Sequence, residues 1–247
     1  MTVLSTVIAV AVLATITVAV VLLLRLDSPW LQPWALLRAG VQLGVLILLL
    51  NSIISSPLGV ALFLLVMVAA ATWIIYRRLR LAASVLPAIV LIIVVSAAIP
   101  VAAVFLFSGI EFSARYLLAV GGIVIGNTMT VCTLMGRQLR ILYVAQRDEI
   151  EGWLALGATP RRATQRAVRS AASGALIPSI DQTRTTGIVT LPGAFVGAVF
   201  AGASPLFAAQ FQLLVLAAVI TAGALTVAGM TLLFGAPQTV ALAEGTG

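Results

Sequence analysis

A short polar and sulfur-containing segment lies inside one of the apolar stretches of this chain. Asn127, Thr128 and Met129 are followed by Cys132 and Met135, and the sulfur-bearing side chains recur every third residue along one flank of a helix. Soft sulfur ligands favour soft metals, whereas iron normally takes carboxylate or imidazole ligands, and the sequence contains no His. The Met and Cys side chains therefore either pack in the core or bind a metal. The Asn and Thr side chains either bridge helices by hydrogen bonds or contact a substrate.

A second set of polar and helix-breaking residues leads into the next apolar stretch. Asp181 and Arg184 are three residues apart, so they either form a structural salt bridge or line a gate at the inner mouth of a transport path. Leu191, Pro192 and Gly193 are expected to break or kink a helix near the middle of a membrane, where freed backbone carbonyls face a cavity. The candidate substrate path comprises Asn127, Thr128, Met129, Cys132, Asp181, Leu191, Pro192 and Gly193.

The segment DEIEGWLALGATPRR, from Asp148 to Arg162, is a polar elbow in an otherwise apolar chain. Ile150, Trp153 and Leu154 have the spacing that places side chains on one face of a helix. Acidic residues gather in the first turn of this helix, where the positive end of the helix dipole favours them. The elbow is therefore expected to begin with a short amphipathic helix.

The residues that follow predict a sharp turn between two helices. Gly157 suits the end of the first helix, Thr159 the N-cap of the second, and Pro160 its first position. The amphipathic helix either lies on the bilayer surface, with arginines contacting lipid phosphates, or enters a groove on a soluble partner. In the docking interpretation the contact residues are Glu149, Ile150, Glu151, Trp153, Leu154, Gly157, Ala158, Thr159 and Pro160.

The elements that position these residues are predicted to cross a membrane. Apolar residues make up 62% of the 247 residues and the mean hydropathy is +1.21, whereas soluble domains are about 45 to 50% apolar. We expect an all-α integral membrane protein with one domain, residues 1–247, and seven spans of about 20 residues each. The expected spans are 3–24, 35–54, 58–76, 81–107, 116–135, 186–203 and 209–234, with a cytoplasmic elbow at 136–184.

The arginines predict the orientation of these spans. All fourteen basic residues are Arg, and thirteen of them fall on one side when the loops are assigned alternately, with only Arg115 on the other. The arginine-rich side is expected to be cytoplasmic, which places the N-terminus outside and the C-terminus inside. The chain is thus expected in the inner (plasma) membrane as a multi-pass protein, in contact with lipid. Nucleic acid is not expected as a partner, because the arginines lie between apolar runs.

Several kinds of chemistry are excluded because the residue types that they need are missing. The chain has no Lys, so it cannot supply the lysine with which a P-loop binds ATP phosphates, and it has no His for a Ser/His/Asp or Cys/His set. A single cysteine, Cys132, excludes an intrachain disulfide and a cysteine-built zinc site. We therefore expect no enzyme activity and no cofactor bound by this chain.

Three segments resemble known transport proteins. EGWLALGATP, from Glu151 to Pro160, looks like the EAA-type loop of ABC-transporter permeases, although Gly152 and Trp153 replace the two alanines of the importer consensus. GGIVIGNTM (121–129), LGATPRRA and IPSIDQTRTTGIVTLPGAFVGAVFAGASP (177–205) together resemble the FetB-type permease family. That family is linked to bacterial iron export and metal homeostasis, and its plant relatives are linked to aluminium tolerance.

The resemblance implies a seven-span permease subunit that exports iron or another metal ion. It implies a separate FetA-type ATPase that binds ATP and Mg, two permeases assembled with two ATPases, and a coupling role for the elbow helix. A self-sufficient secondary transporter or channel is the alternative, which inverted repeats or a membrane-buried carboxylate would favour. A membrane scaffold that only recruits a partner is a third interpretation. Transport that depends on ATP and the ATPase distinguishes the first from both others.

Overall fold

The computed structural model describes residues 2–26, 28–54 and 56–236. Within these ranges the regular structure is helical, apart from one isolated bridge between Thr186 and Thr190, so the predicted all-α class is confirmed. The chain divides into two compact units, Met1–Ser56 and Pro57–Gly247, which are described separately below.

The first unit consists of two apolar helices, α1 (Val3–Leu23) and α2 (Leu31–Ile54), which pack against each other. The side chain of Thr2 caps α1 by accepting a hydrogen bond from the N–H of Ser5. Most of the described apolar side chains of both helices are exposed, which suits helices surrounded by lipid.

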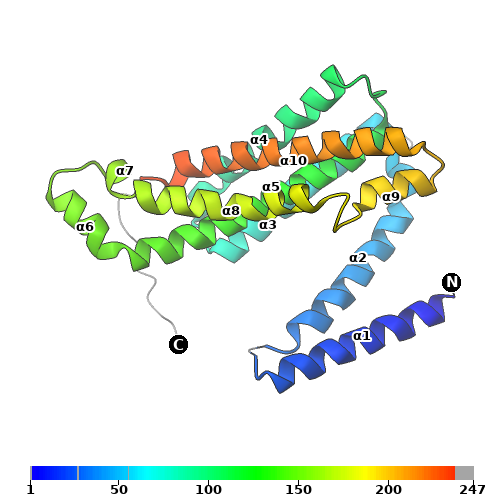
Figure 1. The fold of residues 1–247 in the computed structure, drawn as a ribbon, viewed down its shortest axis with the longest axis horizontal. Helices are drawn as coiled ribbons and strands as arrows, with labels where there is room; N and C mark the ends of the chain where they lie inside the picture. The colour runs from blue at the N-terminus through cyan, green and yellow to red at the C-terminus, as the bar shows by residue number, and fades with distance from the viewer. Residues whose placement is uncertain (1, 27, 55, 237–247) are drawn as a thin grey trace. The chain divides into compact units, whose positions relative to one another are not determined.

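The second unit is a bundle built around one long helix, α5 (Ala114–Ala145). Four other long helices pack directly on α5, and Figure 1 shows them running alongside it. They are α3 (Pro57–Leu79), α4 (Leu86–Phe107, preceded by the 3-10 turn Ala83–Val85), α8 (Gln165–Thr185) and α10 (Pro205–Phe234). Fully buried side chains of Ile75, Ile89, Ile93, Met135 and Met230 fill the space between them.

Glycines allow close approach of helices at two contacts with α5 and α8. A Cβ on Gly121 of α5 would lie 3.1 Å from Leu64 of α3, and a Cβ on Gly223 of α10 would lie 3.1 Å from Leu176 of α8. Small residues are a usual means of close helix packing in membranes, where lipid is as apolar as the side chains. The bundle therefore relies on packing between complementary surfaces.

Three short helices connect the long ones. The elbow between α5 and α8 contains α6 (Arg147–Ala155) and the single turn α7 (Pro160–Ala163). The connection between α8 and α10 contains α9 (Gly193–Phe200), which packs on α10. In Figure 1 the α6–α7 elbow and α9 lie towards opposite ends of the bundle.

Six helices of the described residues are long and apolar enough to cross a membrane, which confirms a multi-pass membrane protein. They are Val3–Leu23, Leu31–Leu49, Pro57–Leu79, Ala83–Phe107, Ala114–Ala145 and Pro205–Phe234. Each overlaps one of the expected spans. The number seven and the orientation remain predictions.

The structure differs from the prediction around the expected sixth span and the expected elbow. Residues 186–203 do not form one membrane-length helix, because they contain a turn followed by the eight-residue α9. Residues 136–145 continue α5, and residues 165–184 belong to α8, which packs against both α5 and α10. Only residues 146–164 connect the two bundle helices. Hydropathy misplaced these boundaries because α8 is polar on its exposed side yet packs against α5 and α10.

Candidate functional site

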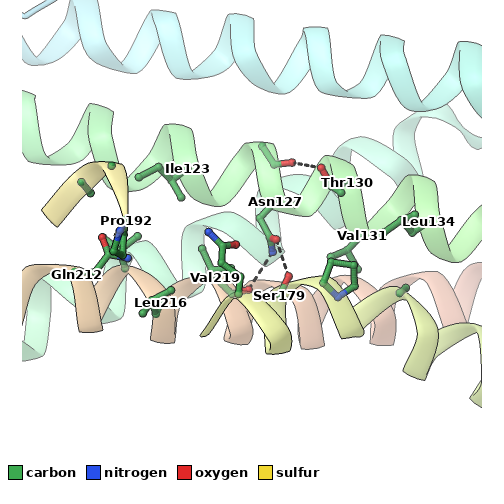
Figure 2. Close-up of a pocket in the computed structure, with 17 residues that line it drawn as sticks. Ile123, Asn127, Thr130, Val131, Leu134, Ser179, Pro192, Gln212, Leu216 and Val219 are labelled. Carbon is green, nitrogen blue, oxygen red and sulfur yellow. Dashed lines mark hydrogen bonds between the residues drawn. The ribbon is translucent and has the colours of Figure 1, made fainter. Parts of the chain in front are cut away.

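A cavity of about 500 Å³ lies between α5, α8, α9 and α10, all within the second unit (Figure 2). Its polar side chains are neutral, and among the described residues no Asp, Glu or Arg lines it. Amides and hydroxyls come from Asn127, Thr130, Ser179, Gln182 and Gln212. The remaining lining residues are apolar or small: Ile123, Gly126, Val131, Leu134, Ala175, Pro178, Pro192, Gly193, Ala194, Val215, Leu216 and Val219.

Asn127 joins three helices at the wall of this cavity. Its Nδ2 donates to the backbone oxygen of Val219 on α10 at 3.1 Å, and its Oδ1 accepts from the hydroxyl of Ser179 on α8 at 2.9 Å, as the dashed lines in Figure 2 show. The sequence left interhelical bonding and substrate contact open for this residue. The structure confirms interhelical bonding, and it also brings Asn127 to the cavity surface.

The cavity lies where the chain breaks between α8 and α9. After α8 the N–H groups of residues 188–190 all donate to the backbone oxygen of Thr185, and Gly187 takes a φ of +87°, which favours glycine. Pro192 then starts α9. A break was expected at Leu191–Gly193. The structure extends it to residues 186–192 and places its end at the cavity.

Contacts between α5 and α8 fix the depth of this break along the bundle. Ser179 meets Asn127, and Gly174 lies against Gln138, so α8 runs antiparallel to α5. If the same antiparallel pairing continues for about a turn and a half of α8 beyond Ser179, Thr185 lies near the level of Ile123 on α5. Ile123 is inside the expected span 116–135. The break is therefore level with the N-terminal third of α5, inside the apolar part of that helix.

The candidate substrate path is only partly brought together. Asn127, Pro192 and Gly193 line the cavity. Thr128 is fully buried outside the lining, and its hydroxyl has no hydrogen-bond partner. Leu191 is 72% exposed and is not part of the lining.

Asp181 lies on α8, is exposed, and is not part of the cavity lining. The structure has no ion pair between it and Arg184, so it does not show the salt-bridge alternative for this pair. The two side chains are three residues apart on α8. Neighbouring positions on one helix allow such a pair but do not require it, because water solvates exposed charges about as well.

The sulfur-bearing side chains of α5 belong to the hydrophobic core. Cys132 and Met135 are fully buried, and Met129 packs against the same core. Among the described residues no group of three or more His, Cys, Asp or Glu side chains is placed to hold a metal ion. Core packing is therefore the correct interpretation for this flank, and the cavity does not include it.

Three polar cavity residues were missed in the sequence. Ser179, Gln182 and Gln212 all line the cavity, and Gln212 is only 6% exposed. A signal was present for Gln212, because it is a carboxamide inside the apolar stretch 209–234, and polar residues in such stretches mark functional positions. Ser179 and Gln182 lay in the part of the chain that was assigned to the elbow.

The amphipathic elbow helix has one buried and two exposed apolar positions. Ile150 is 2% exposed and anchors α6 to its own chain, whereas Trp153 and Leu154 are 45% and 40% exposed. The three were expected to form one ridge for a partner, so Ile150 is corrected to an internal anchor. Leu156, just after α6, is 83% exposed and adds to the outward apolar surface.

The predicted turn after the elbow helix is confirmed. Gly157 has a φ of +84°, its N–H donates to Leu154, and the N–H of Ala158 donates to Trp153, which is the hydrogen-bond pattern of a Schellman helix end. Pro160 opens α7, and Thr159 precedes it in extended conformation without a side-chain cap bond.

Two exposed ion pairs and one buried hydrogen bond occur at the elbow. Two of its glutamates are paired, Glu151 with Arg147 at 2.6 Å and Glu149 with Arg166 at 3.2 Å. The hydrogen bond to Glu151 raises the pKa of the Arg147 guanidinium above its usual value. The hydroxyl of buried Thr164 donates to the backbone oxygen of Gly235 at 2.6 Å, which ties the elbow to the end of α10.

Comparison with known proteins places the chain in a family. Residues 4–237 match the uncharacterised protein family UPF0014. The chain belongs to the UPF0014 family. The UPF0014 membrane protein YjkA of Bacillus subtilis (strain 168) is 33% identical to it over 198 residues, which are 78% of each chain.

Two further relatives agree with the FetB-type resemblance seen in the sequence. "Probable iron export permease protein FetB" of Escherichia coli (strain K12) is 31% identical over 185 residues, 74% of this chain and 71% of that protein. "Protein ALUMINUM SENSITIVE 3" of Arabidopsis thaliana is 42% identical over 120 residues, 49% of this chain. The match covers only 43% of the plant protein. None of the solved structures matches this UPF0014 chain.

Proposed function

We propose that this chain is the permease subunit of an ABC transporter that exports iron or another metal ion, driven by a separate ATPase. The observation that carries the proposal is the similarity, over about three quarters of the chain, to a protein named as an iron export permease. The absence of Lys from the sequence supports the need for a separate ATPase, because a P-loop requires that residue.

The elbow is the proposed docking site for the ATPase. A coupling helix must be fixed to its own permease and must present an apolar surface to the partner. Buried Ile150 and the Thr164–Gly235 bond supply the fixing, and exposed Trp153, Leu154 and Leu156 supply the surface. A tryptophan that enters a pocket on the partner is the kind of residue that carries much of an interface's binding energy.

The broken segment is the proposed sixth crossing of the membrane. α8 reaches the level of the N-terminal third of α5, the turn at residues 186–192 follows, and α9 continues towards the start of α10. Broken helices are tolerated at membrane depth where the irregular backbone lines a cavity, and transporters place substrate sites at such breaks. The cavity at this break is the proposed substrate site, in an assembly of two permeases with two ATPases.

The proposal is tested by reconstituting the purified chain into liposomes with a FetA-type P-loop ATPase. We expect iron to move across the bilayer only when ATP and the ATPase are both present. The chain alone is expected to show no ATP hydrolysis, and an ATPase variant without its P-loop lysine should support no transport.

The outcomes separate this proposal from its alternatives. Iron movement by the chain alone, without ATP, would identify a secondary transporter or channel. Binding of the ATPase without transport of any metal would support a scaffold. Either result contradicts the proposed function.

A further inference from the structure

The N-terminus of α9 faces the cavity without a cap. The first backbone bond of this helix runs from the N–H of Val196 to the oxygen of Pro192 at 3.0 Å, so the N–H groups of residues 193–195 have no acceptor within the helix. The N-cap residue is Pro192, which supplies no side-chain bond. Helix N-termini usually receive such a bond from Ser, Thr, Asp or Asn.

The cavity wall is open at this helix end. Pro192, Gly193 and Ala194 line the cavity, and a Cβ built on Gly193 would meet no atom within 4 Å. A ligand can therefore approach the free N–H groups closely. Because the positive end of the helix dipole lies at the same place, the site favours a negatively charged group.

Gln212 on α10 is a second, independent sign of a ligand. Gln212 is 6% exposed, that is, 94% buried, and the residue lines the same cavity. Its Oε1 has no hydrogen-bond partner among the described residues. Figure 2 shows its side chain beside Pro192. A carboxamide carries a donor at one end and an acceptor at the other, so it can donate to an oxyanion or accept from a hydroxyl group or bound water.

The cavity lacks the groups that bind a bare metal ion. No carboxylate or thiolate lines it, and the sequence has no His, whereas iron normally takes carboxylate or imidazole ligands. No acidic side chain in the lining would repel an anion. The volume of about 500 Å³ is in the range of small-molecule sites.

We propose that this cavity binds an oxyanion-bearing ligand, held by the α9 N-terminal N–H groups and the Gln212 carboxamide. The inference rests on the proposed function and specifies its substrate class: the metal enters the site as a complex with carboxylate or phosphate ligands. The shared chemistry is the oxyanion, which the metal-bound and the free ligand both present.

Binding to the purified full-length permease in detergent tests the site directly. Citrate, ferric citrate and ferrous chloride serve as probes, with affinity measured by isothermal titration. We expect ferric citrate and citrate to bind and ferrous chloride not to bind. Ferric citrate binding at least about tenfold tighter than citrate would assign the site to the metal complex, and equal affinities would assign it to the free oxyanion.

Two pairs of variants locate the contacts. Gly193→Pro removes one N–H at the first helical position, where proline is tolerated, and Gly193→Ala is its control because it keeps the N–H. Gln212→Leu removes the carboxamide, and Gln210→Leu, at an exposed position outside this cavity, is the matched control. We expect Gly193→Pro and Gln212→Leu each to weaken citrate binding about tenfold, Gly193→Ala to bind citrate more tightly than Gly193→Pro because it keeps the N–H, and Gln210→Leu to bind normally.

Stability separates a ligand contact from a structural role for Gln212. Because its buried oxygen has no partner in the protein, Gln212→Leu should leave the thermal unfolding midpoint unchanged or higher. If Gln212→Leu fails to fold, citrate binding is measured instead with Gln212→Met and with the two Gly193 variants.

Three results would overturn the inference. They are binding of ferrous chloride in place of citrate, absence of citrate and ferric citrate binding to the wild type, and undiminished citrate binding by both Gly193→Pro and Gln212→Leu. If iron transport depends on ATP but the chain binds no oxyanion, this inference is wrong while the proposed function stands. Oxyanion binding by a chain whose transport needs neither ATP nor the ATPase would defeat the proposed function alone.

Discussion

Two carboxamides in the membrane-spanning part of the bundle have different bonding. Asn127 has both ends of its amide used, by Val219 and Ser179, so it holds three helices together at the cavity wall. Gln212 lines the same cavity, and its buried Oε1 has no hydrogen-bond partner among the described residues. A polar group in lipid is costly unless it is bonded, so the bonding of Asn127 accounts for its presence, and the unpaired oxygen of Gln212 is consistent with the proposed ligand.

At this scale we predict that transport tolerates loss of Cys132 better than loss of Asn127. Asn127→Leu removes two hydrogen bonds next to the broken helix, which should lower the free energy of unfolding by about 1 to 2 kcal/mol and transport by about tenfold or more. Cys132→Ala removes one buried sulfur outside the cavity and should leave transport within about twofold. An ATP-dependent iron efflux assay makes the comparison. An inactive cysteine variant beside an active asparagine variant would reverse this ranking.

The elbow helix α6 has one apolar side chain that packs against its own chain and two that are exposed. Ile150 points into its own chain while Trp153 and Leu154 remain exposed, although all three were expected on one face. Side chains that share one face of a helix still point in somewhat different directions. A neighbouring element can therefore bury one of them and leave the others exposed. In this elbow α7 packs against α6, and Glu149 pairs with Arg166 at the start of α8.

Two substitutions in the elbow should therefore have opposite effects. Trp153→Ala should leave the permease folded but weaken ATPase binding by more than about 2 kcal/mol, or roughly thirtyfold, if the exposed tryptophan is the central anchor. Ile150→Ala should lower the free energy of unfolding by about 2 to 5 kcal/mol, because it opens a cavity in packed structure.

Co-purification of the ATPase in detergent, measured beside thermal unfolding of the permease, checks both expectations. Insertion and orientation in the membrane provide the common control. Full retention and full stimulation of the ATPase by the Trp153→Ala protein would show that the elbow helix rests on lipid.

For the whole molecule, the central question is which segment makes the sixth crossing. Ile177 on α8 lies between the Gly174–Gln138 and Ser179–Asn127 contacts, so it is level with the segment of α5 between Asn127 and Gln138 and is 53% exposed on the bundle surface. In a membrane this surface faces lipid or another subunit. The expected elbow 136–184 would instead have placed Ile177 in cytoplasmic water.

Single cysteines in a Cys132→Ala background distinguish these topologies. A membrane-impermeant maleimide should label Leu156→Cys from the cytoplasmic side and Phe112→Cys from the outside, since both positions are exposed in turns at opposite ends of the bundle. Ile177→Cys should react from neither side. Rapid labelling of Ile177→Cys from the cytoplasm would contradict a crossing by α8, and exchanged sides for the other two would contradict the predicted orientation.

The sequence alone determined the membrane class, the all-α architecture and the approximate position of six apolar helices, because burial of a backbone in lipid demands long apolar helices that composition reveals directly. It also located the turn within the elbow, because Gly157 permits a positive φ and Pro160 suits the first position of a helix. Only the tertiary structure decided that polar α8 belongs to the bundle and that Ile150 is an internal anchor. It alone brought Gln212 together with the start of α9. These depend on which surfaces of distant helices meet, and no local pattern of side chains records that.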